Sequence, residues 1–268
     1  MPELARLRLV TSRQNALVKE LRRAFAEGEL TQDGHCAIES ARIVEEAVRS
    51  GLRFKAVFFN KSAGDRAERL LPQIAAHTET LLLPDDVFAG TVSTESPQGV
   101  AALVKLKSFE LDDLLRPAAP LMVVAAGLQD PGNLGTILRS AEAFEATGVL
   151  VAQGTVSPYN AKAVRASAGS LFRLPLVRAE MAAALPKLKE RGIRLVGTSS
   201  HKGTVIHEAR LSGPLAVFVG NEGAGLPREL LTQMDELVTI PHSPRVESLN
   251  ARIAASLVLY EAARQRRT

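Results

Sequence analysis

Three polar loops carry the residue types best suited to chemistry, and each follows a short apolar run. The first loop leads from Asn133 to Arg139, the second contains Glu222, and the third contains Ser248 and Asn250. In open sheets of parallel strands, ligands bind in the crevice beyond the carboxyl ends of the strands. We therefore expect these loops to meet at one edge of a sheet and to form a ligand site there.

Closely spaced glycines distinguish the second loop. Glycines at positions 220, 223 and 225 give a G-x-x-G-x-G spacing, which differs from the G-x-G-x-x-G of dinucleotide-binding folds. The sequence also lacks the G-x-x-x-x-G-K-[ST] pattern of phosphate-binding loops. Such a loop either allows a ligand to approach the backbone closely or forms a tight turn with no ligand.

The elements that must position these loops are predicted from residue 121 onward. Residues 121–127 form an apolar run of strand length, and residues 134–144 place apolar side chains at helical spacing. Further strands are expected at 149–152, 193–198, 215–220 and 237–241, and a terminal helix is expected at 249–264. Apolar strands that alternate with helices predict an α/β fold whose parallel sheet is covered on both faces.

The first hundred residues have a different pattern, typical of a small mixed α/β domain. Helices are expected at 15–25, 38–50 and 70–77, and strands at 55–59, 79–83 and 99–106. A charged stretch and a proline-containing segment interrupt the pattern between residues 107 and 120. We therefore predict two domains, residues 1–112 and residues 118–268.

Composition and charge limit the class of protein. No run of 18 apolar residues occurs, the first residues lack a signal-peptide core, and Cys36 is the single cysteine, so a cytoplasmic protein without membrane contact is expected. The net charge is +4, and basic residues gather near both ends of the sequence. These clusters indicate either contacts with RNA phosphates or solvated helix faces. The histidines show no metal-ligand spacing, so no metal is expected.

The three loops together, at residues 129–139, 219–226 and 240–250, resemble in order and spacing the signature motifs of the SpoU (TrmH-like) family of RNA 2′-O-ribose methyltransferases, in the SPOUT superfamily. The similarity covers about residues 120–265, and residues 157–175 resemble the ribosomal RNA branch. A looser resemblance links the first hundred residues to the family's RNA-binding domain. There, Glu39 and Ser40 stand where Glu-Gly is more usual.

The resemblance implies an architecture and a set of partners. It implies a parallel-sheet SPOUT domain with a deep trefoil knot, preceded by a small α/β RNA-binding domain. It also implies S-adenosyl-L-methionine as the cofactor, RNA as the substrate and a homodimer. The terminal helix, with Leu257, Val258 and Tyr260, is a candidate for the dimer contact, and ordinary core packing is its alternative.

The same resemblance assigns roles to individual residues. Arg139 takes the role of activating the ribose hydroxyl, either as a base or as an electrostatic stabiliser, although the permanent charge of its guanidinium makes arginine an awkward base. Ser248 and Asn250 either cap the last helix or bind ligand. The predicted catalytic residues are Arg139, Asn133, Glu222, Ser248 and Asn250; the predicted cofactor-binding residues are Gly220, Ile240, Leu249 and Thr198; the predicted RNA-binding residues are Arg13, Lys19, Arg22 and Arg165.

Three positions depart from the family pattern. His242 stands where methionine is common, Pro244 where glycine is usual, and Arg252 is unexpected after Asn250 and Ala251. The predicted function is S-adenosylmethionine-dependent 2′-O-methylation of RNA, with ribosomal RNA as the preferred substrate. The alternatives are a transfer RNA methyltransferase, a drug-resistance enzyme that acts on ribosomal RNA, and a non-catalytic RNA-binding or ribosome-assembly factor. A nicotinamide enzyme is disfavoured by the glycine spacing.

Overall fold

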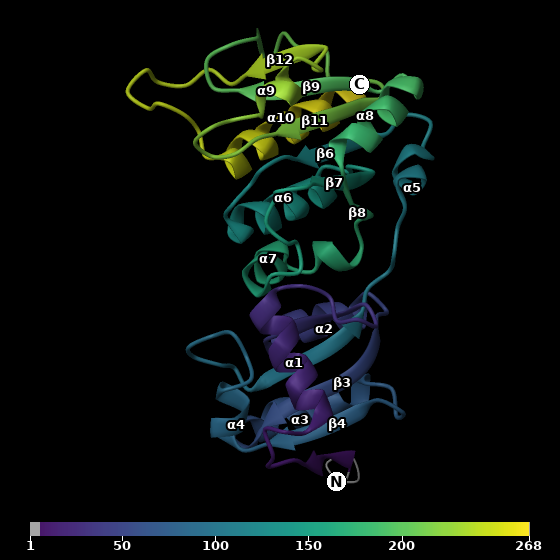
Figure 1. Cartoon of the computed structure of the whole chain (residues 1–268), viewed down its shortest axis with the longest axis vertical. Coiled ribbons are helices and arrows are strands. Elements are labelled where there is room, and N and C mark those ends of the chain that lie inside the picture. Colours follow the sequence, from purple (N-terminus) through teal and green to yellow (C-terminus); the bar gives the residue numbers. More distant parts are fainter. Residues whose placement is uncertain (1–5, 268) are drawn as a thin grey trace. The chain divides into compact units, whose positions relative to one another are not determined.

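The computed structural model describes residues 6–267, which divide into two compact units (Figure 1). The first unit comprises Met1–Lys107 and Ser157–Phe172, and the second comprises Ser108–Val156 and Arg173–Thr268. The predicted division at residues 112 and 118 differs from this arrangement in one main respect. Residues 157–172 pack with the first unit, because Ala161 joins the same apolar core as Phe25 and Leu103.

The first unit is a mixed five-stranded sheet with helices on both faces. Its strand order is β1-β4-β3-β5-β2, and β5 runs antiparallel to both of its neighbours. Helix α1 places Val18 and Leu21 against one face, and α2 and α3 cover the other. The elements are β1 (Arg8–Leu9), α1 (Ala16–Glu27), β2 (His35–Glu39), α2 (Ala41–Arg49), β3 (Arg53–Asn60), α3 (Gly64–Leu70), β4 (Glu79–Leu83), α4 (Asp85–Ala89), β5 (Val100–Lys105) and α7 (Ala161–Ser167).

The second unit contains a seven-stranded sheet that is parallel throughout, as the sequence predicts. Its strand order is β10-β12-β9-β11-β6-β7-β8, so the chain order reverses around β11 and β6. The elements are α5 (Leu111–Leu115), β6 (Leu121–Ala125), α6 (Pro131–Ala143), β7 (Gly148–Ala152), β8 (Leu176–Ala179), α8 (Met181–Glu190), β9 (Arg194–Ser199), β10 (Thr204–Val205), β11 (Leu215–Val219), α9 (Arg228–Leu231), β12 (Glu236–Thr239) and α10 (Ala251–Arg266).

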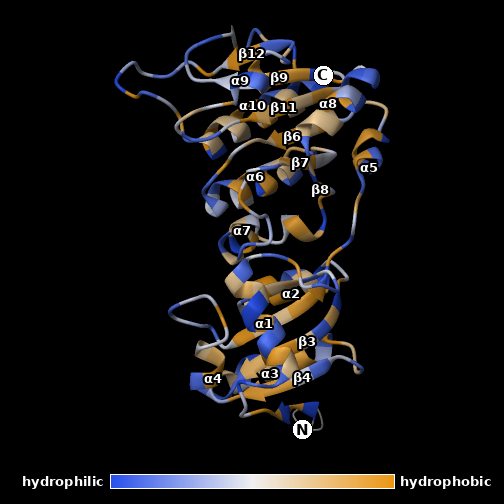
Figure 2. Cartoon of the chain, in the orientation of Figure 1, coloured by the Kyte–Doolittle hydropathy of each residue, from blue (hydrophilic) through white to orange (hydrophobic). Residues whose placement is uncertain are grey.

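Alternate side chains of each strand in the second unit pack on opposite faces of the sheet. Met122 and Phe218 share one buried cluster with Leu188 of α8 and Leu230 of α9. The intervening residues point the other way, since side chains alternate along a strand. Helices α6 and α10 pack together on that side and against β7 and β11. The strands of both sheets are mainly hydrophobic in Figure 2, which is why each needs two covering layers.

Two helix predictions for the first unit are wrong at their ends. The expected helix at 38–50 begins only at Ala41, because Ile38 and Glu39 belong to β2 and pair with β5. The expected helix at 70–77 is instead the end of α3 followed by a 3-10 turn, Leu71–Gln73, that contains Pro72. Proline lacks the backbone N–H that continues a helix. None of the helices in the described chain combines the length and the hydropathy needed to span a lipid bilayer.

Candidate functional site

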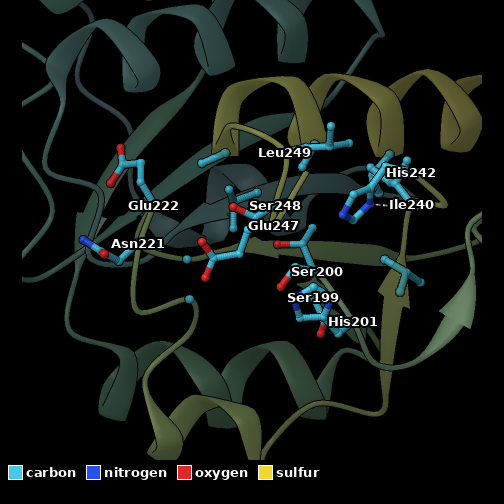
Figure 3. A pocket seen from close by; sticks show the side chains of 18 of the residues that line it. Ser199, Ser200, His201, Asn221, Glu222, Ile240, His242, Glu247, Ser248 and Leu249 are labelled. Atoms are coloured by element: carbon cyan, nitrogen blue, oxygen red, sulfur yellow. Dashed lines mark hydrogen bonds between the residues drawn. The ribbon is translucent and has the colours of Figure 1, made fainter. Parts of the chain in front are cut away.

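A pocket of about 320 Å³ lies where strands β9, β11 and β12 end, between the loops that follow them and the start of α10 (Figure 3). This is the carboxyl edge of the parallel sheet, where such folds bind ligands. The pocket is lined by Thr198, Ser199, Ser200, His201, Val219, Gly220, Asn221, Glu222, Gly223, Gly225, Val238, Ile240, His242, Glu247, Ser248, Leu249, Ala251, Ala254 and Val258. Its walls therefore combine aliphatic side chains, hydroxyls, two imidazoles and two carboxylates.

Asn221 organises the glycine-rich loop after β11. Its backbone N–H and C=O pair with Gly225 at 2.9 and 3.0 Å, and its side-chain oxygen accepts hydrogen bonds from Gly223 N and Ala224 N. The side-chain amide also donates to Gly127 O at 3.0 Å, which joins this loop to the loop after β6. A β-carbon on Gly220 would collide with the backbone of Gly225 and Leu226, so only glycine fits there.

Glu222 makes a second connection between the same two loops. Its carboxylate accepts a 2.7 Å hydrogen bond from the Asn133 amide and a longer one, at 3.5 Å, from Gln129 N. Burial raises the pKa of Glu222, but the hydrogen bonds from Asn133 and from backbone N–H groups outweigh burial and leave the pKa below its ordinary value. The carboxylate is therefore charged at neutral pH.

Helix α6 begins beside this hydrogen bond and carries Arg139. Asp130 caps the helix by accepting from Gly132 N at 2.7 Å, and Pro131 occupies the first turn, where a missing N–H costs nothing. Asn133 is buried in that first turn. Arg139 lies further along the helix, is exposed, and has no hydrogen bond or ion pair with the residues that the structure describes. Its guanidinium is thus available to an outside anion.

The loop that leads from β12 to α10 forms another wall of the pocket. Ile240, Ser248 and Leu249 line the cavity. His242 also lines it, and its Nδ1 lies 2.7 Å from Ile240 O. Asn250 caps α10 by accepting from Arg252 N at 3.0 Å.

The structure brings together most of the residues predicted for the cofactor and the reaction. Those that line the pocket are Thr198, Gly220, Glu222, Ile240, Ser248 and Leu249. Asn133 reaches the pocket through Glu222, whereas Arg139 and Asn250 do not line it. The hydroxyl of Thr198 donates to Phe218 O at 3.1 Å, so it joins two neighbouring strands as well.

Several lining residues were not singled out as site residues in the sequence. Ser199 is the last residue of β9, Ser200 and His201 follow it, and Glu247 precedes Ser248. Asn221 carried a usable signal, because the side chain of an asparagine commonly organises a turn by hydrogen-bonding the backbone two residues further on. The others lie in ordinary polar loops, and only the folded arrangement of three strand ends places them together.

The predicted RNA-binding residues all belong to the first unit, but their surroundings differ. Lys19 and Arg22 are exposed on α1 and have no partner among the described residues. Arg13 forms a 3.2 Å ion pair with Asp86 in which both side chains are exposed. Arg165 is half-buried in α7. Burial raises the pKa of Glu39, and the charge of Arg165 opposes this effect only in part. Lys19 and Arg22 are therefore the better placed of the four for phosphate contacts.

A compact group of potential metal ligands in the first unit consists of Glu20, Asp33 and His35. The Lys55 ammonium already contacts two of them, at 2.7 Å from Glu20 and 3.1 Å from Asp33. Burial and the nearby Lys55 charge lower the pKa of His35. The lysine thus supplies the positive charge for this group, and the expectation of no metal stays a prediction.

Comparison with known proteins decides the family. The model of the SpoU rRNA methylase family matches residues 120–260, which span the whole pocket, and the model of an MRM3-like substrate-binding domain matches residues 15–102. The chain belongs to the SpoU rRNA methylase family. The family predicted from the three loops is confirmed, and so is the α/β architecture with a small domain before the parallel sheet.

Similar SpoU proteins cover nearly the full length of the chain. It is 30% identical to the 23S rRNA (guanosine(2553)-2′-O)-methyltransferase RlmP of Bacillus subtilis, over 95% of this chain and 98% of that protein. It is 34% identical to an uncharacterised tRNA/rRNA methyltransferase of Synechocystis, over 96% of this chain and 93% of that protein. The crystal structure of the SpoU methyltransferase AviRb of Streptomyces viridochromogenes with the cofactor AdoMet superposes with a TM-score of 0.83 at 30% identity, covering 95% of this chain and 99% of that one.

The residues around the pocket fit S-adenosylmethionine, the cofactor of this SpoU methyltransferase. The cofactor joins a flat, largely apolar purine to a ribose and a cationic sulfonium amino acid. Val238, Ile240 and Leu249 offer apolar surface for the purine, and the charged Glu222 and Glu247 offer a favourable field for the cation. The volume also falls at the lower end of the range of about 300–1,000 Å³ found for small-ligand pockets.

Proposed function

We propose that the protein transfers the methyl group of S-adenosylmethionine to a ribose 2′-hydroxyl in ribosomal RNA. One observation supports this most directly. The hydrogen bond between Asn133 and Glu222 ties the first turn of α6 to the wall of the pocket, and the same helix presents Arg139, which has no partner in the part of the chain that the structure describes. A relative that covers almost the whole chain is named a 23S ribosomal RNA 2′-O-methyltransferase.

When bound, the cofactor supplies a methyl group made electrophilic by the neighbouring sulfonium. The residues of the chain have to orient the acceptor ribose and to manage its proton. The guanidinium of Arg139 is a permanent cation and a poor base, so its role is to stabilise the oxyanion that develops on the ribose as the hydroxyl proton passes to water. An RNA phosphate bound to the same guanidinium would place the ribose beside it, and positioning of two reactants is itself a large part of the acceleration.

Asn133 and Glu222 are positioning residues in this scheme. Their 2.7 Å hydrogen bond fixes the start of α6 against the glycine-rich loop, and Asn221 adds a parallel link to Gly127. Ser248 is exposed and lines the pocket, so it is placed to bond either the cofactor or the ribose. Asn250 acts as the cap of α10 and thereby holds the loop that carries Ser248 and Leu249.

The test is transfer of labelled methyl from S-adenosylmethionine to total RNA from cells that lack this protein, with the RNAs separated by size. We expect label in ribosomal RNA, recovered after digestion as a 2′-O-methylnucleoside. Label confined to transfer RNA would replace the proposed substrate with the alternative that the Synechocystis name leaves open. Absence of label in naked RNA and in assembling ribosomal particles, with cofactor binding intact, would favour a non-catalytic binding factor.

We infer that residues 1–112, together with the α7 segment, bind the RNA substrate. The match to a substrate-binding domain and the exposed Lys19 and Arg22 support this role. Each phosphate neutralised by a cation contributes a slope of about −0.7 to −0.9 to the dependence of log K on log salt. The double variant Lys19→Ala/Arg22→Ala should therefore flatten this slope by about 1–2. An unchanged slope would assign both residues to a solvated face.

We also propose that the protein is a cytoplasmic homodimer whose cofactor site is threaded into a trefoil knot. The family resemblance supports the knot, and the fact that the loops after β9, β11 and β12 enclose one pocket is compatible with it. Helix α10 exposes Ile253, Leu257 and Tyr260 along one side, which supports a dimer contact there. Cytoplasmic location follows from the ribosomal RNA substrate named for the relative in Bacillus subtilis.

A further inference from the structure

Two histidines stand at one end of the pocket, opposite the loop that carries Glu222. The rings of His201 and His242 lie 6.3 Å apart between centroids and are tilted by 36°. Figure 3 places them beside Ser199 and Ser200, with Asn221 and Glu222 at the far side of the cavity. The two ends of the pocket thus differ chemically, one acidic and the other formed by imidazoles and hydroxyls.

The hydrogen bond of His242 determines what its ring offers to a ligand. Nδ1 lies 2.7 Å from Ile240 O, and a carbonyl oxygen can only accept, so Nδ1 carries the proton. In the neutral ring the other nitrogen, Nε2, is then an acceptor. Figure 3 shows that nitrogen turned away from Ile240 and toward the interior of the pocket. His242 therefore presents a fixed acceptor to the ligand.

The orientation of the cofactor follows from the chemical difference between the two ends of the pocket. This assignment of orientation rests on the function proposed above. The reacting methyl group has to face α6, which Asn133 joins to Glu222 at the acidic end. A cationic sulfonium is also most favourable near the carboxylates. The purine then occupies the other end, between the apolar surfaces of Val238, Ile240 and Leu249 and within reach of the histidines.

We propose that Nε2 of His242 accepts a hydrogen bond from the 6-amino group of the cofactor's adenine. This makes His242 a specificity-determining residue, because it favours a purine with a donor at position 6 over one with an oxo group there. A 6-oxo purine would place one acceptor against another, and a buried acceptor that is left unpaired is costly. The imidazole takes this role at a position where methionine is common in the family.

The proposal predicts a base preference that depends on His242. Isothermal titration of the full-length protein would compare S-adenosylhomocysteine with S-inosylhomocysteine, which differ at the 6-position and in the proton on N1. We expect the wild type to bind the adenosyl compound at least about 10-fold more tightly. The His242→Met variant should bind it about 3- to 10-fold more weakly, and its preference between the two compounds should fall toward 1.

Two further variants make the result specific. His242→Gln keeps an acceptor near the position of Nε2 and should retain part of the preference. His207→Met changes an exposed histidine that pairs with Glu208 outside the pocket, and it should behave as the wild type. Thermal denaturation would confirm that each variant is folded before titration.

The outcomes separate this inference from the function on which it rests. A full base preference in a folded His242→Met variant that still binds S-adenosylhomocysteine would overturn the role of His242 alone. No binding of S-adenosylhomocysteine by the wild type would overturn the pocket assignment and this inference with it. A preference that is lost in His242→Met and kept in His207→Met would support the inference.

Discussion

At the scale of single residues, the side chains that hold the loops together differ from the side chain proposed to act on the substrate. Asn133 and Glu222 hydrogen-bond each other, and the side chain of Asn221 hydrogen-bonds the backbone. These side chains are therefore largely occupied in joining the two loops. Arg139 has no hydrogen bond or ion pair among the described residues. This is consistent with our proposal that its guanidinium contacts the RNA.

Replacement of Arg139 should therefore affect turnover and leave the cofactor site intact. We expect Arg139→Ala to lower kcat by about 10²–10³-fold or more, the loss typical of a removed oxyanion stabiliser. Affinity for S-adenosylmethionine, measured by titration calorimetry, should stay within a few-fold. Arg191→Ala changes another exposed arginine of the same unit and serves as the control. Near-normal turnover by Arg139→Ala would remove this residue from the mechanism.

Many residues of this site could be predicted from the sequence. The others could not be, for a physical reason. The resemblance of three loops to the SpoU motifs predicts Glu222, Ile240 and Ser248 as site residues, and the apolar strands before those loops predict that they lie at one sheet edge. His201 and Glu247 could not be found in the same way. Their position depends on which strands become neighbours in the order β12-β9-β11, and that order is not encoded in any local pattern.

At the scale of elements, the junction between β2 and α2 stores backbone strain. Ser40 has φ 87° and ψ 145°, a region that glycine populates easily and other residues rarely do. The serine hydroxyl accepts a weak hydrogen bond from Ile43 N at 3.4 Å, which caps α2. The sequence expectation of a helix through residue 40 overlooked this turn, because the apolar residues before it fit a helix or a strand equally well.

Ser40→Gly should stabilise the protein for this reason. Relief of strain of about 1–3 kcal/mol outweighs the few tenths of a kcal/mol lost when glycine replaces a capping serine. We expect a net gain of about 1 kcal/mol in the free energy of unfolding, measured by denaturant titration. Ser40→Ala is the matched control, since it loses the cap and keeps the strain, and it should be destabilised. Equal stability of both variants would show that the turn is not strained.

Helix α10 is attached to the rest of its unit by a network around Glu261. This nearly buried carboxylate accepts from Arg264 at 2.8 and 2.9 Å and from Gln265, which in turn bonds Leu211 N and Ala209 O. The hydrogen bonds from Arg264 and then Gln265 lower the pKa of Glu261 to about 2 despite burial. Since the folded pKa lies below the ordinary value, the carboxylate stabilises the fold when it is charged.

The stabilisation by Glu261 should therefore disappear in acid. It is fully present above about pH 4.5, the ordinary value, and is lost as the pH falls toward 2. Glu261→Gln should lower the free energy of unfolding by about 1–3 kcal/mol at pH 7, and its difference from the wild type should close over that acid range. Glu145→Gln breaks the exposed pair with Arg267 and should cost less than about 1 kcal/mol. A pH-independent Glu261→Gln effect would contradict this account.

At the scale of the whole molecule, α10 serves two surfaces. Val258 and Leu259 are buried against the sheet and α6, whereas Ile253, Leu257 and Tyr260 are 46%, 40% and 54% exposed. Tyr260 packs edge-on against Phe144 of the segment after α6, with ring centroids 5.8 Å apart. The exposed side chains recur at helical spacing, so they form one apolar stripe suited to a second copy of the chain.

Leu257→Glu should accordingly disrupt the homodimer that we propose and yield a monomer. A carboxylate in the centre of an apolar interface would be desolvated without a partner, which is costly. Sedimentation equilibrium over a range of concentrations would measure the change. Leu231→Glu, at an exposed leucine of α9, is the control and should leave the dimer intact. A monomeric wild type, or a Leu257→Glu variant that remains a dimer, would place the contact elsewhere or exclude it.

Residues 157–172 belong to the first unit, and this limits how that unit can be transferred between related enzymes. A chimaera that takes its amino-terminal portion from a relative by a single crossover would keep its own α7 beneath a foreign helix α1. Ala161 of α7 lies in the same core as Phe25, and Asn160 lies directly against Gly28. Transfer of this unit between relatives therefore requires both of its sequence fragments, residues 1–107 and 157–172. The contacting residues of the two fragments should also change together as these proteins diverge.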